Sequence, residues 1–203
     1  MTWKEYFRKY KFHLFIILII FIATLFVIYN VLHFIENRTG TVLNDPFLNL
    51  IPSLNVSVPL FLLTYFGTLF GIGYVLRKPD LTIITALTYI LILWLRIACM
   101  YFTPLEPPDN IIPLRDFILE STFYSGNVNL KDLFFSGHTA SMFLFFMVIP
   151  NKFIKGIYLF ITFLVASLVL IQHAHYTIDV LVAPIMVWFA YQMAKKIKLI
   201  VFQ

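Results

Sequence analysis

The sequence predicts an all-α, polytopic membrane protein with six transmembrane helices, and three observations support that prediction. Apolar residues make up 61% of the 203 residues and charged residues only 12%, about half the ~25% that is typical of soluble domains. Six stretches approach the ~20 mostly apolar residues that a membrane-spanning helix needs. The basic residues concentrate in alternate connections between these stretches.

The six stretches follow one another without an internal repeat or a change of composition, so we expect one domain over residues 1–203. The first stretch is longer than the ~7–15 apolar residues of a signal peptide, which predicts a helix and not a cleavable leader. The fourth stretch is short and could begin before Ser136. The expected spans are residues 13–35, 56–76, 81–103, 136–150 and, divided at 173–175, 153–194.

The basic residues predict the orientation, because cytoplasmic connections carry an excess of Lys and Arg. Six spans place both termini on the same side of the membrane, and the connections on the other side carry only Arg38, Arg115 and Lys131. Both termini are therefore expected in the cytoplasm. The net charge of +5 is explained by the basic residues on that side, so we expect no nucleic-acid partner. The side with the termini carries Lys4, Arg8, Lys9, Lys11, Arg77, Lys78, Lys152, Lys155, Lys195, Lys196 and Lys198.

The outer side holds two long connections, at about residues 36–55 and 104–135, and long connections are often functional. The second contains four prolines and a possible short amphipathic segment at residues 114–123. The single cysteine, Cys99, excludes an intrachain disulfide.

Ionisable groups in apolar stretches indicate a functional site, because they are costly to bury in a membrane. His175 and Asp179 are four residues apart, so a helix would place them on one face. His138, in the sequence Ser136-Gly137-His138-Thr139, begins the fourth span on the same side. Arg96 lies seven residues before Thr103, about 10 Å below the outer end of its span.

Two imidazoles and a carboxylate suit phosphoryl-type transfer. One imidazole can attack phosphorus while the carboxylate holds it, and the second can protonate the leaving oxygen and later deprotonate the acceptor. Gly137 allows close backbone approach, a helix start at Ser136 favours a phosphate, and Arg96 could add positive charge or simply pair with an acid.

Two other interpretations use the same residues. A zinc site could be built from His138, His173, His175 and Asp179, although His173 and His175 would point apart on a helix. A proton-coupled transporter also uses intramembrane His and Asp, but it would place them near the midplane and show two related halves. We therefore expect an enzyme without a metal or other cofactor, with His173 secondary to its site, and keep a non-enzymatic transporter or scaffold as the further alternative.

Four motifs resemble the type 2 phosphatidic acid phosphatase superfamily, most closely its sphingomyelin synthase branch. Two are supportive: residues 43–46 running on to 51–52, and Arg96 through Met100, Thr103, Leu105 and Pro108. The specific pair is Asp132-Leu133-Phe134-Phe135-Ser136-Gly137-His138-Thr139 and His175-Tyr176-Thr177-Ile178-Asp179-Val180.

The resemblance implies that His175 is the nucleophile, that Asp179 orients it and that His138 is the acid and later the base. Substrate binding is expected from Arg96, Ser136, Gly137, Tyr176 and Asp132. The implied partners are a phospholipid donor and a lipid acceptor, ceramide or diacylglycerol. A phosphatase or phospholipase C-like hydrolase would use the same site with water as acceptor.

The departures from these families also carry information. Leu130-Lys131 stands where the synthases have Cys-Gly, and the chain lacks the longer tails of animal synthases, so we expect a relative in a bacterial inner membrane. Phe135 and Leu168-Val169 replace the Pro and the Ser-Arg of the phosphatase motifs. Since a poorly paired dianion is costly in a low-dielectric pocket, we expect a phosphodiester substrate and not a monoester, with the site on the extracytoplasmic side.

Overall fold

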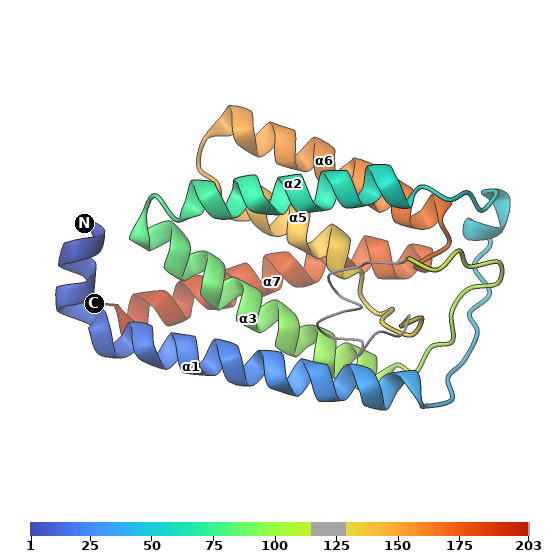
Figure 1. Cartoon of the computed structure of the whole chain (residues 1–203), viewed down its shortest axis with the longest axis horizontal. Helices are drawn as coiled ribbons and strands as arrows, with labels where there is room; N and C mark the ends of the chain where they lie inside the picture. Colours follow the sequence, from blue (N-terminus) through green and yellow to red (C-terminus); the bar gives the residue numbers. More distant parts are fainter. Residues whose placement is uncertain (115–128, 203) are drawn as a thin grey trace.

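The computed structural model describes residues 1–114 and 129–202 (Figure 1). Apart from one bridge between Thr41 and Leu105, these residues form helices and connections only, which confirms the all-α prediction. The predicted amphipathic segment at 114–123 lies outside the described residues except for Leu114. The helices are α1 (Trp3–Glu36), η1 (Leu48–Leu50), α2 (Ser57–Val75), α3 (Pro79–Phe102), α5 (Gly137–Val148), α6 (Lys152–Ile171) and α7 (Thr177–Val201).

Each of the six apolar stretches forms a helix, and five of the described helices are long and apolar enough to cross a membrane. The exception is α5, whose 12 residues extend only about 18 Å. The helix does not begin before Ser136, because Ser136 is its N-cap. The six helices are therefore confirmed, whereas a sixth full-length span is not shown.

The bundle is built around α3, which packs against α1, α2, α5 and α7. A row of small residues on α7 allows close packing, because small side chains let helix backbones approach. Large apolar side chains such as Phe160 and Phe163 point outward from α6 and are mostly exposed, as expected of a protein embedded in lipid. The row on α7 consists of Ala183, Val187, Ala190 and Ala194, all fully buried.

Both termini lie at one end of the bundle (Figure 1). We call the opposite end the outer end, and it contains two long connections, of which the first includes η1. The first outer segment, residues 37–56, joins α1 to α2, and the second outer segment, residues 103–114, follows α3. The turn at residues 172–176 between α6 and α7 lies at the same end, so the predicted site residues all approach the outer end.

Candidate functional site

The first part of the candidate site is the start of α5. Ser136 is fully buried, and its hydroxyl oxygen accepts a hydrogen bond from the Thr139 amide at 3.4 Å. The Ser136 amide donates to the main-chain oxygen of Asp179 at 3.1 Å, which ties the start of α5 to the start of α7. Ser136 thus holds the helix start that presents Gly137 and His138.

The second part is the turn that leads into α7. His175 precedes the first helical residue, Thr177, so it does not stack on Asp179 along a helix face as the four-residue spacing suggested. The two residues still meet, with His175 Nδ1 at 3.3 Å from Asp179 Oδ2. The same carboxylate oxygen accepts the Tyr176 amide at 3.0 Å. Asp179 caps the helix start and holds the imidazole from the same position.

Both members of this pair are buried, since His175 is 4% and Asp179 0% exposed. The contact at Nδ1 leaves Nε2 of His175 as the nitrogen that can face a substrate. Asp179 Oδ1 has no hydrogen-bond partner among the described residues.

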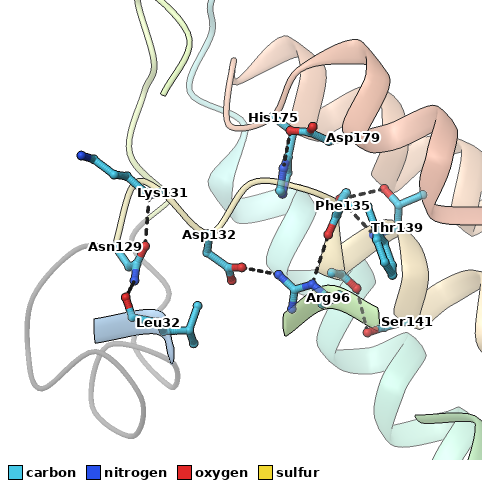
Figure 2. Close-up of polar contacts among 12 residues, drawn as sticks. Leu32, Arg96, Asn129, Lys131, Asp132, Phe135, Thr139, Ser141, His175 and Asp179 are labelled. Atoms are coloured by element: carbon cyan, nitrogen blue, oxygen red, sulfur yellow. Dashed lines mark hydrogen bonds and ion pairs between the residues drawn. The ribbon is translucent and has the colours of Figure 1, made fainter. Parts of the chain in front are cut away.

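The third part is Arg96, which is 8% exposed and reaches across from α3. Its Nε donates to the main-chain oxygen of Phe135 at 3.1 Å, and its Nη2 forms an ion pair with Asp132. Figure 2 shows the guanidinium between these two partners, next to the start of α5. A Cβ atom on Gly137 would lie 2.9 Å from Arg96 Nη1, so glycine there allows the guanidinium to approach the helix start.

These three parts line one cavity of about 280 Å³. Its polar wall contains five of the predicted residues: Arg96, Asp132, Gly137, His138 and His175. Much of the remaining wall is apolar or aromatic and comes from α1, α2 and α3. That part includes Leu25, Ile28, Leu32, Tyr65, Tyr89 and Leu93.

Three predicted residues do not line this cavity: Ser136, Tyr176 and Asp179. Asp179 lies directly behind His175, and Ser136 caps α5. The hydroxyl of Tyr176 donates to the main-chain oxygen of Glu106 at 3.0 Å and accepts from the Leu43 amide at 3.1 Å. Tyr176 therefore contacts the two outer segments and not the cavity.

The geometry does not assemble the zinc site that the sequence left open. His173 directs Nε2 to the main-chain oxygen of Ile51 at 2.8 Å and Nδ1 to that of Asp109 at 3.2 Å. Both of its possible ligand atoms thus face main-chain oxygens of the two outer segments. Within residues 1–114 and 129–202, no three His, Cys, Asp or Glu side chains gather closely enough to hold a metal ion.

Sequence reasoning missed the role of Asp45. Its carboxylate accepts the Thr177 amide at 2.6 Å and the Thr177 hydroxyl at 3.0 Å, and it also accepts the Leu48 amide at 3.0 Å. Burial alone would raise the pKa of Asp45, but the hydrogen bonds from Leu48 and Thr177 hold it below its ordinary value. The Asp-Pro pair at 45–46 was noted as a motif, but nothing local indicates a contact 132 residues away.

Lys131 replaces a glycine of the synthase pattern and joins the two outer segments. Its ammonium donates to Glu106 Oε1 at 2.9 Å and to the main-chain oxygen of Arg38 at 2.6 Å. The Lys131 hydrogen bond, with a second from the Gly40 amide, lowers the pKa of Glu106. Lys131 therefore has partners in both outer segments, and its neighbour Asp132 pairs with Arg96.

Comparisons with known proteins bear on the same part of the chain. Residues 131–196 match a protein family described as PAP2 superfamily C-terminal, where PAP2 denotes type 2 phosphatidic acid phosphatase. No curated protein and no solved structure matches the chain. The matched third of the chain includes Asp132, His138, His175 and Asp179 but not Arg96. The match is limited to this third of the chain, and it agrees there with the resemblance of the two specific motifs to the type 2 phosphatidic acid phosphatase superfamily.

Proposed function

We propose that this protein is a membrane lipid phosphotransferase that moves a phosphorylated headgroup from a glycerophospholipid to a lipid alcohol, ceramide or diacylglycerol. The observation that carries the proposal is the cavity. It unites His175, His138 and Arg96, which come from three separate helix regions, with an apolar wall from α1 and α3. Polar groups on one wall and apolar groups on the others suit a molecule with a phosphate and hydrocarbon chains.

In the first half-reaction, Nε2 of His175 attacks phosphorus and the bond from phosphorus to the glycerol oxygen breaks. His138 donates a proton to that oxygen, so diacylglycerol leaves as a neutral alcohol. Asp179 accepts a hydrogen bond from Nδ1 of His175 and stabilises the positive charge that develops on the ring. The headgroup phosphate is then bonded to His175.

In the second half-reaction, the acceptor hydroxyl attacks phosphorus and the bond to His175 breaks. His138, now lacking the proton that it gave to diacylglycerol, removes the proton of the acceptor hydroxyl. The enzyme returns to its starting protonation state. Arg96 and the start of α5 stabilise the negative oxygens of the phosphate in both steps.

The charges of the cavity favour a phosphodiester over a phosphate monoester. Arg96 and Asp132 are the only Lys, Arg, Asp or Glu side chains among the described residues that line it. They pair with each other, so together they supply no net charge. A diester carries one negative charge, whereas a monoester approaches two near neutral pH and would need more positive charge than this wall offers.

The test is an assay of purified protein in nanodiscs with a headgroup-labelled glycerophospholipid, with and without ceramide or diacylglycerol. Label appearing in a new lipid only when the acceptor is present is the expected result. Release of free phosphorylated headgroup would instead establish the hydrolase alternative. No turnover of any phospholipid would contradict both and favour a transporter or scaffold, and loss of activity with a chelator would return attention to a metal.

A further inference from the structure

The turn that carries His175 is fastened to both outer segments by side chains that the proposed chemistry does not use. The first of these is Gln172, which is fully buried. Its Oε1 accepts the Val56 amide at 3.2 Å, and its Nε2 donates to the main-chain oxygen of Ile112 at 3.3 Å. Val56 belongs to the first outer segment and Ile112 to the second, so one side chain bridges the two.

His173 makes the same kind of bridge. It is 5% exposed, with Nε2 facing the main-chain oxygen of Ile51 in the first segment and Nδ1 facing that of Asp109 in the second. Its φ of 53° lies in the left-handed region, which costs His and Asn less than most residues.

Tyr176 completes the pattern on the other side of His175. Its hydroxyl accepts from Leu43 in the first segment and donates to Glu106 in the second. Gln172, His173 and Tyr176 thus each make a polar contact to both outer segments, within a stretch of five residues that contains His175. Together, the three side chains hold the turn between the two outer segments.

We propose that Gln172, His173 and Tyr176 are positioning residues that fix His175 for attack, an inference that rests on the proposed function. They act through the backbone of the turn, because none of the three lines the cavity. Loosening the bridges should therefore lower turnover more than it weakens lipid binding. A displacement of about 1 Å at a reacting group can cost about 10²-fold in rate.

The decisive variant is Tyr176→Phe, which removes both hydrogen bonds and keeps the ring. We expect kcat to fall by about 10- to 100-fold, with KM changing less than about twofold. Tyr158→Phe is the matched control, since its buried hydroxyl donates to the main-chain oxygen of Gly67 at 2.6 Å, outside the cavity. It should retain kcat at a similar loss of thermal stability.

His173→Asn and His173→Ala provide a second test if Tyr176→Phe does not fold. Asn tolerates the left-handed backbone and keeps an amide donor, so it should retain clearly more kcat than Ala. Equal kcat in the two variants, or equal kcat in Tyr176→Phe and Tyr158→Phe, would overturn the proposal.

Hydrogen exchange separates this inference from the proposed function, because it needs no substrate. Backbone amides of residues 172–180 should exchange at least about tenfold faster in Tyr176→Phe than in Tyr158→Phe. If exchange is faster in Tyr176→Phe but the unaltered protein turns over no lipid, the proposed phosphotransferase function is contradicted, whereas the role of Tyr176 in holding the turn is supported. Unchanged exchange in an enzyme that does transfer headgroups would contradict the positioning role alone.

Discussion

The starts of α5 and α7 face the same site but are built with opposite electrostatics. The first turn of α5 contains no acidic residue, and its cap is the neutral hydroxyl of Ser136. The start of α7 receives two carboxylates, Asp179 from its own first turn and Asp45 from the first outer segment. Since a helix N-terminus carries a partial positive charge, α5 keeps that charge for a ligand whereas α7 has it neutralised.

The difference suggests a division of labour between the two helix starts. An N-terminus without a carboxylate is suited to an incoming phosphate, and the guanidinium N–H groups of Arg96, which also pairs with Asp132, lie beside it. An N-terminus already paired with carboxylates would compete less for the phosphate and can hold an imidazole that becomes cationic. In the proposed reaction, one helix start binds the anion and the other carries the group that attacks it.

The largest expected effect comes from removing either imidazole. His175→Ala should abolish transfer, and His138→Ala should lower it by about 10²- to 10⁴-fold. A phosphodiester with a nitrophenol leaving group needs no proton from an acid, so it should restore the first step in His138→Ala but not in His175→Ala. Release of nitrophenol measures both.

His33→Ala is the matched control for these variants, since this imidazole packs against Tyr29 on α1 and does not line the cavity. Its activity should equal that of the unaltered protein. Restoration of His175→Ala by the activated substrate would show that His175 is not the nucleophile.

The next effect tests the positive charge beside α5. Arg96→Lys keeps the charge but cannot contact Asp132 and the Phe135 oxygen in the same planar geometry. We expect kcat/KM to fall by about 10²-fold, equivalent to about 2.7 kcal/mol of transition-state stabilisation. Steady-state kinetics with a diester donor measure it, and a loss smaller than threefold would contradict a phosphate role for Arg96.

A smaller effect is expected where Arg96 meets the helix start. Gly137→Ala places a methyl group 2.9 Å from Arg96 Nη1, so the guanidinium must shift and kcat/KM should fall by about tenfold. Gly73→Ala in α2 and Gly156→Ala in α6 are matched controls, because a Cβ there meets nothing within 4 Å. Both variants should retain activity. Replacing a glycine inside a helix by alanine is also expected to raise the stability of the protein by roughly 0.5–1 kcal/mol. Full activity in Gly137→Ala would show that the close approach is not needed.

The smallest effect concerns the carboxylate at the start of α7. Because the folded-state pKa of Asp45 is depressed, its contribution to stability is present above its unfolded pKa of about 3.9 and is lost as pH falls through the folded value. Thermal unfolding measured between pH 7 and pH 3 should show that acidification destabilises the unaltered protein more than it destabilises Asp45→Asn. Parallel curves for the two proteins would contradict the contact as a source of acid sensitivity.

Local pattern predicted the helices well because each apolar stretch determines its own conformation. The boundaries of α2 and α3 lie within about two residues of those expected. His175 and Asp179 also meet as expected, although across the start of α7 and not along a helix face. What could not be predicted depends on distant residues. Arg96 meets Asp132 across 36 positions, and Tyr176 meets Leu43 across 133. A single sequence carries no signal for either contact.

The same limit explains why some residues lie elsewhere in the structure than the sequence predicts. Ser136 and Tyr176 stand inside specific motifs, so they were expected at the substrate, but each contacts main-chain groups. His173 is expected to be secondary because a helix would point it away from His175. The two residues lie in the turn before α7, where His173 contacts one main-chain oxygen of each outer segment.

The depth of Arg96 has a consequence for the competition between acceptors. The seven-residue descent from Thr103, the C-cap of α3, places Arg96 about 10 Å beneath the outer end of that helix. At that depth in a hydrocarbon layer of ~30 Å, water is scarce while lipid alcohols are concentrated. A phosphorylated histidine there would encounter a lipid hydroxyl more often than in an exposed site. Burial depth could thus favour transfer over hydrolysis without any residue dedicated to excluding water.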